Sequence, residues 1–221
     1  EAAAQNAEDL TRAAMGDAPT DEARLALRWN RLPREAMVEL VGQLHNGAPL
    51  DLLLGELGPE ASQRVKDALL EGLAMGRNPR VIARDVRRGM GMPLTRSLRI
   101  SRTETLRAHR LATLANYQAN SDVVKGWRWS ASHSSRTCLA CLAMDGKVFP
   151  LDKPMPAHVN CRCSVTPQAV SWRDLGVDAP DVEPGSTGAE WFAKQPASVQ
   201  REMLGNEGYT AYKSGKVTLD D

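Results

Sequence analysis

The clustering of the cysteines constrains this chain most, because all four lie between positions 138 and 163. Cys138 and Cys141 form a C-x2-C pair, and Cys161 and Cys163 form a second pair with His158 just ahead of it. A C-x2-C turn directs two thiolates at one metal ion. Residues two apart in an extended segment point to the same side, so the second pair can converge too. The spacing therefore predicts a tetrahedral zinc site.

Five candidate ligands compete for the four places of such a site. Cys138, Cys141 and Cys163 form the core of the predicted set, and His158 and Cys161 are alternatives for the fourth place. Two other states of the cysteines stay open, namely a pair of disulfides in an oxidising compartment or four reduced thiols without metal. A catalytic metal needs an open coordination place and a general base nearby, so we predict a structural Zn²⁺ ion.

The charge of the chain is distributed unevenly, although the net charge is only +1. Between Gly76 and Arg110, ten arginines stand against one aspartate and one glutamate, which gives 10 − 2 = +8. This stretch favours a partner that carries phosphates or an acidic surface, and Arg84, Arg87 and Arg88 are its candidate contacts with DNA or a protein partner. The alternative is a solvated helical face whose arginines pair with acids elsewhere.

Helix caps and breakers predict helices on both sides of a short β region. The β region is predicted from a strand at Val123–Ser130, a hairpin at Asp145-Gly146 and a returning strand at Cys161–Thr166. The predicted helices start after Thr20, at Pro33, at Pro59, at Asn78-Pro79, near Leu94, at Thr187 and after Pro196, and a last one runs through Tyr209 and Tyr212. The helix that starts near Leu94 is the longest and runs to Asn120. The helix that starts at Pro33 is ended by Asn46-Gly47-Ala48-Pro49.

These elements predict an α+β chain with three regions. Residues 1–76 are expected to form a helical N-terminal region, and residues 77–170 a core in which the long helix packs on a small β subdomain resembling a zinc knuckle. Residues 171–221 are expected to form a linker and a helical C-terminal tail. The sequence has no apolar run of about 18 residues and no signal-peptide pattern, so we expect a soluble protein that does not enter a membrane.

Two groups of residues resemble the signatures of the phage Mu F-like minor head protein family. Arg102-Thr103-Glu104 on the long predicted helix resembles the Arg-Thr-Glu signature of that family. Asp145-Gly146, followed by a stretch that includes His158, Asn160, Cys161, Arg162 and Cys163, is similar to its second signature. The resemblance covers roughly Arg77 to Thr166. Many relatives have an arginine and a histidine in place of the first cysteine pair, which implies that the fold can exist without metal.

The resemblance implies a role in the virion of a tailed bacteriophage. A minor head protein binds the portal protein, or the major capsid or scaffold protein, during head morphogenesis, and it contacts double-stranded DNA during packaging or ejection. Its expected location is the capsid interior, after assembly in the cytoplasm of the host bacterium. The alternative is a zinc-dependent phage enzyme, either a nuclease or an ADP-ribosyltransferase-like effector. A deaminase is disfavoured because no H-x-E motif precedes the cysteine pair.

The motif residues also suggest an ion pair. Arg102 and Glu104 are two apart on a helix, so they cannot face each other, and each needs a partner elsewhere. Arg162 stands between two cysteines and points to the opposite face of an extended segment. We therefore hypothesise a bidentate pair between Glu104 and Arg162.

Overall fold

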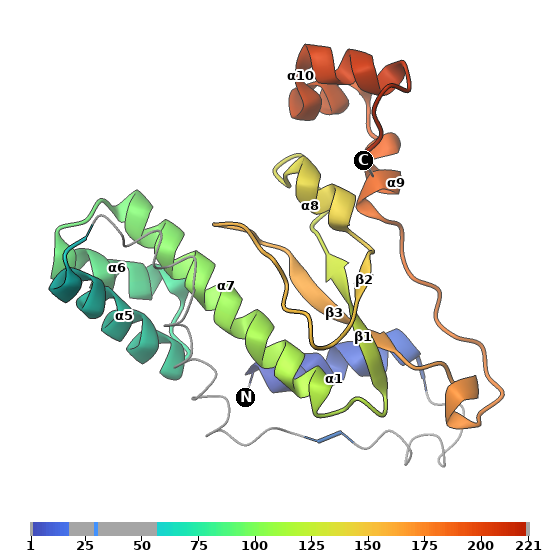
Figure 1. The fold of residues 1–221 in the computed structure, drawn as a ribbon, viewed down its shortest axis with the longest axis horizontal. Coiled ribbons are helices and arrows are strands. Elements are labelled where there is room, and N and C mark those ends of the chain that lie inside the picture. Colours follow the sequence, from blue (N-terminus) through green and yellow to red (C-terminus); the bar gives the residue numbers. More distant parts are fainter. Residues whose placement is uncertain (1, 18–28, 31–56, 220–221) are drawn as a thin grey trace. The chain divides into compact units, whose positions relative to one another are not determined.

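The computed structural model describes residues 2–17, 29–30 and 57–219, and its fold is α+β (Figure 1). The described chain is helical at both ends and contains a three-stranded antiparallel sheet, which confirms the predicted fold class. The helices predicted at Thr20 and Pro33, and the break at Asn46–Pro49, lie outside the described residues.

Two compact units make up the chain, and each is assembled from separate stretches. The helical unit consists of Glu1–Gln5, Asn30–Ala119 and the short segment Pro156–Cys161. The sheet unit consists of Asn6–Trp29, Asn120–Met155 and Arg162–Asp221. The chain thus enters the helical unit a last time at residues 156–161 and then returns to the sheet unit.

The helical unit contains α5 (Pro59–Ala74), α6 (Pro79–Met90) and α7 (Leu94–Gln118). The start of α6 follows from Asn78, whose side chain accepts a hydrogen bond from the Arg80 amide, and from Pro79 in the first turn. Gly91 ends α6 in the left-handed conformation, with φ of 60°. These boundaries agree with the predicted ones. The buried core of the unit is formed by Val65, Leu69, Ile82, Val86, Met92 and Ile100.

The sheet has the strand order β2-β1-β3, with β1 at Val124–Ser130, β2 at Val148–Phe149 and β3 at Ser164–Ala169. The predicted strand at residues 123–130 is therefore confirmed. Trp127 of β1 is fully buried, stacks on Phe149 at 4.5 Å between ring centroids, and donates its indole N–H to the Lys153 carbonyl at 2.8 Å. This aromatic pair joins β1 to β2 across the ladder.

The predicted hairpin at Asp145-Gly146 is wrong, because the residues before it form the helix α8 (Leu139–Met144). Its sequence contains leucine, alanine and methionine, which favour helix, and no β-branched residue. The Asp145-Gly146 turn instead leads from α8 into β2. The Gly146 amide donates to the Trp129 carbonyl and the Trp129 amide to the Lys147 carbonyl, both at 2.9 Å. The returning strand also starts later than predicted, at Ser164.

The C-terminal part contains a 3-10 turn, η2 (Arg173–Leu175), and the helices α9 (Gly188–Ala193) and α10 (Ala197–Lys213). A capping box stands at the predicted start of α9, because Thr187 and Glu190 exchange side-chain to backbone hydrogen bonds there. Gly205 interrupts α10 with φ of 71°, between the helix predicted after Pro196 and the one predicted through Tyr209 and Tyr212.

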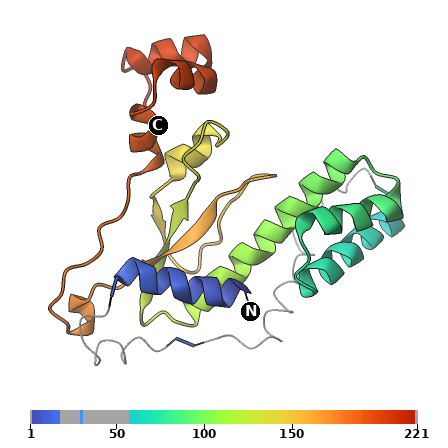
Figure 2. The same ribbon diagram turned by 180° about the vertical axis from the view of Figure 1, so that it is seen from behind.

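The N-terminal helix α1 (Ala2–Met15) is absent from the sequence-based prediction. Trp172, which precedes η2, is buried against Met15 and donates its indole N–H to the Met15 carbonyl at 2.8 Å. Leu10, Ala13, Ala14 and Met15 of α1 line a cavity of about 510 Å³ together with β1 and β3 residues, and Figure 2 shows the helix beside the sheet. Trp172 is thus a core anchor of the sheet unit.

Candidate metal centre

Three of the predicted ligands belong to the sheet unit and converge at the start of α8. Cys138 caps this helix and is exposed, whereas Cys141 lies within it with only 3% of its surface exposed. Cys163 is buried immediately before β3. The Sγ atoms of Cys138 and Cys163 each lie within 4.8 Å of the Cys141 Sγ. The C-x2-C pair thus converges because residues 138 and 141 share the first turn of a helix.

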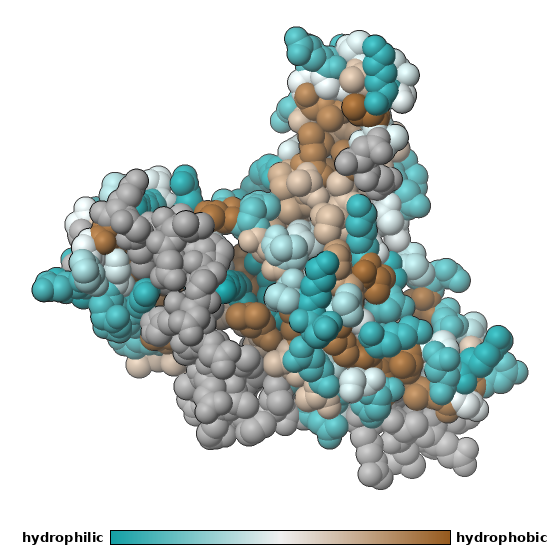
Figure 3. Space-filling view, in the orientation of Figure 1, coloured by the Kyte–Doolittle hydropathy of each residue, from teal (hydrophilic) through white to brown (hydrophobic). Residues whose placement is uncertain are grey.

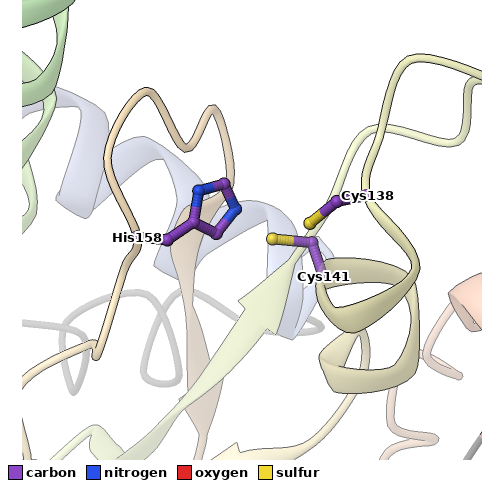
Figure 4. A group of neighbouring side chains, drawn as sticks. All are labelled: Cys138, Cys141 and His158. Atoms are coloured by element: carbon purple, nitrogen blue, oxygen red, sulfur yellow. The ribbon is translucent and has the colours of Figure 1, made fainter.

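The two alternative ligands, His158 and Cys161, follow on the segment Pro156–Cys161. The ligand atoms of Cys138, Cys141 and His158 all lie within 4.8 Å of one another, and Figure 4 shows the imidazole directed towards the two sulfur atoms. The Sγ atoms of Cys141, Cys161 and Cys163 form a second such group. The five residues therefore form one Cys/His cluster that could hold a metal ion, and Cys141 belongs to both groups. All four cysteines are free thiols, without disulfides.

The hydrogen bond of the His158 ring is compatible with metal binding through Nε2. Its Nδ1 lies 2.9 Å from the Val159 carbonyl oxygen, which can only accept a hydrogen bond. In a neutral imidazole this bond requires the proton on Nδ1, which leaves the lone pair on Nε2 for a metal ion. A histidine that binds zinc commonly donates its other ring N–H to a carbonyl or carboxylate in this way. Cys161 is almost fully buried, and its thiol is also a group that binds zinc. Both His158 and Cys161 are therefore still candidates for the fourth ligand.

The second cysteine pair follows the predicted alternation. Cys161 and Cys163 are buried, and Arg162 between them is exposed. Glu104, the hypothesised partner of Arg162, is fully buried on α7, with its Oε2 4.0 Å from Nη1 of Arg107 on the next turn. A buried carboxylate is stable only with compensating charge or hydrogen bonds, and Arg107 supplies charge from the same helix. The Glu104–Arg162 pair stays a prediction.

The two sequence motifs meet inside the helical unit. The Asn160 amide donates to Oγ1 of Thr103 at 2.9 Å, and Nη2 of Arg110 donates to the Cys161 carbonyl at 2.9 Å. Asn160 has φ of 60°, a left-handed conformation that asparagine tolerates better than most residues. Sequence reasoning did not find the role of Arg110. The available signal was its spacing, because residues 103 and 110 are seven apart and share one face of α7.

Asp145 and Gly146 have structural roles outside the metal cluster. One carboxylate oxygen of Asp145 accepts the Ala131 amide at 2.7 Å, and the other lies 2.8 Å from Nε2 of His133. Neither Asp145 nor His133 belongs to a ligand group among the described residues. Gly146 has φ of 86°, and a Cβ there would lie 2.9 Å from Cγ2 of Thr187. The two residues thus hold the turn after α8 in place.

The arginine-rich stretch does not form one continuous face. Arg84, Arg87 and Arg88 are exposed on one side of α6. Figure 3 shows hydrophilic residues on the surface of the helical unit. Arg77 forms ion pairs with Glu71 and Asp85, both at 3.3 Å, as the alternative interpretation expects. Arg110 is buried and binds a backbone carbonyl. The stretch therefore has both structural arginines and solvated ones.

Comparison with known proteins identifies the region that contains these motifs. Residues 63–166 match the family described as Phage Mu protein F like protein. This part of the chain is therefore similar to the Phage Mu F-like family. This range includes Arg102-Thr103-Glu104 and all five candidate ligands.

One relative is the Mu-like prophage FluMu F protein of Haemophilus influenzae, which is 35% identical over 93 residues. The match covers 38% of this chain and 22% of the relative, so the chain spans about a fifth of the length of that protein. No solved structure matches the chain. Among the helices that the structure describes, none has both the length and the apolar character needed to cross a bilayer.

Proposed function

We propose that this chain is a minor head protein that acts in the assembly of a tailed-phage head. The observation that supports this function is the contact between the two family motifs, through the hydrogen bond from Asn160 to Thr103. Both residues lie in the range that matches the Phage Mu F-like family. The motif residues thus hold a helix and a cysteine-bearing segment together. A structural role of the motif residues suits a protein that acts by binding other proteins at its surface.

The proposed main partner is the portal protein, with the major capsid or scaffold protein as a second one. The proposed location is the interior of the capsid, after assembly in the host cytoplasm. The enzyme alternative has no specific support in the described residues, because the acid–base pair His133–Asp145 is outside both ligand groups. Hydrolysis at a metal requires a general base beside an open coordination place.

Mixing this chain with the portal oligomer of the same phage is expected to give a stable complex. In size-exclusion chromatography at low salt, the chain should elute with the portal ring. The portal of an unrelated phage serves as the control and should leave the chain in its own peak. Separate elution from the matched portal, at stoichiometric concentrations, would count against the portal as the partner.

The proposed ion in the Cys/His cluster is Zn²⁺, in a structural role. Thiolate and imidazole groups together favour zinc over magnesium or calcium, which prefer oxygen ligands. Cys141, Cys161 and Cys163 are each at most 3% exposed, so their sulfur atoms have little access to water. Ionised thiolates in such a place need a cation beside them. A closed site with four protein ligands is the arrangement of structural zinc.

The proposed DNA contact is the exposed face of α6 that carries Arg84, Arg87 and Arg88. These side chains are spaced so that they lie on one side of the helix. Arg88 is close to Asp85, at 3.9 Å, but its side chain is 79% exposed, and such an ion pair contributes little. The three guanidinium groups therefore stay available to phosphates. This interaction would accompany head assembly rather than replace it.

A further inference from the structure

We infer that α7 positions the ligand segment of the metal site, with Thr103 and Arg110 as the positioning residues for His158 and Cys161. This inference rests on the proposed zinc site and extends it to residues that bind no metal themselves. All the contacts that carry it lie within the helical unit, between α7 and the segment Pro156–Cys161.

The first contact fixes the backbone at Asn160. Oγ1 of Thr103 donates to the Arg99 carbonyl at 2.8 Å and accepts the Asn160 amide at 2.9 Å. The two hydrogen bonds use the donor and an acceptor position of the hydroxyl, so they hold its rotamer in place. Thr103 is 5% exposed, and water therefore competes little for the Asn160 amide.

The second contact fixes the backbone two peptide units further on. Nη2 of Arg110 donates to the Cys161 carbonyl at 2.9 Å, and Arg110 is 6% exposed. A hydrogen bond from a charged donor is about twice as strong as a neutral one, and low water access strengthens it further. The bond joins residues 51 positions apart, so it is a tertiary contact and not a local turn.

Together these contacts enclose the Asn160–Cys161 peptide between the two candidate ligands. The Cys161 amide also donates to the His158 carbonyl at 3.1 Å, which closes a tight turn around Asn160 and its φ of 60°. The backbone that carries the imidazole and the thiol is therefore ordered by α7 before a metal ion binds. Such preorganisation raises metal affinity, because less conformational freedom is lost on binding.

Thr103→Val and Arg110→Met are therefore each expected to lower the zinc affinity about 10- to 100-fold, the usual effect of losing an outer-shell hydrogen bond. Affinity is measured on the full chain by competition with a chromogenic chelator. Arg110→Lys keeps a cationic donor and is expected to recover part of the loss. Thr95→Val, at an exposed position of the same helix, and Arg87→Met, at an exposed position of α6, are the matched controls and should leave the affinity unchanged.

A second readout separates positioning from general stability. With Co²⁺ in the site, the absorption bands report the number and geometry of the sulfur ligands, so Arg110→Met is expected to shift them, whereas Thr95→Val is not. Urea denaturation of the metal-free chains reports the loss of stability alone. Variants with wild-type zinc affinity and an unchanged cobalt spectrum would overturn the role of α7 and leave the zinc site intact. A wild-type chain that binds no zinc would refute the site and the inference together.

Discussion

Replacing Cys141 with serine is expected to abolish zinc binding and to lower the melting temperature to that of the metal-free wild-type chain. Cys141 is the residue that the two ligand groups share, and only 3% of its surface is exposed. Serine is a poor zinc ligand, so its hydroxyl cannot replace the thiolate that is common to both ligand groups. Free zinc at 1,000 times its Kd stabilises by about 4 kcal/mol, which is on the order of 10 °C for a chain of this size.

The measurements are the zinc content of protein purified without chelator, and thermal melting with and without EDTA. EDTA is expected to lower the melting temperature of the wild type and to leave Cys141→Ser unchanged. Val217→Ser, at a position that is 41% exposed near the C-terminus, is the control for a change of an apolar side chain to serine. One full equivalent of zinc in Cys141→Ser would contradict the central place of this residue. His158→Ala and Cys161→Ser then identify the fourth ligand, since the variant of the true ligand loses more zinc.

Reversing three charges on α6, with Arg84, Arg87 and Arg88 each changed to Glu, is expected to abolish retention of the chain on double-stranded DNA. Each arginine that neutralises a phosphate releases counterions, so binding weakens with salt at a slope of about −0.9 per contact. Loss of three contacts should therefore reduce the salt slope by about three, and repulsion from the new carboxylates adds to the effect. The measurement is DNA affinity at several salt concentrations.

The matched control makes an equal change of net charge in another part of the chain. Arg173, Lys194 and Lys216 are exposed residues of the sheet unit, and their replacement by Glu should leave most of the DNA affinity. Equal loss in both triple variants would mean that only the total charge matters. Unchanged retention of the α6 variant would exclude this face of the helix as the DNA contact.

Local chemistry explains which elements could be predicted from the sequence. Asn78-Pro79 and Gly91 bound α6 because a cap, a fixed φ and a left-handed residue each act within a few residues. Thr187 and Glu190 define the start of α9 for the same reason. The Cys/His cluster was also predictable, since the spacing within each cysteine pair brings two sulfur atoms to one side.

Features that depend on tertiary contacts could not be predicted in this way. The residues of α8 form a short apolar run, and periodicity alone cannot distinguish a helix from a strand at this length. Arg110 belonged by composition to a basic stretch, but its burial and its bond to the Cys161 carbonyl depend on a residue 51 positions away. The central place of Cys141 likewise follows only from the positions of both ligand groups.

The most direct test of the proposed function is quantitative mass spectrometry of particles purified from the phage or prophage that encodes this chain. A minor head protein is expected in proheads and in DNA-filled heads, at a constant and low number of copies per particle. Disruption of these particles should release the chain together with the portal. A chain that is abundant in the cell lysate but absent from proheads and virions would contradict a role in head assembly.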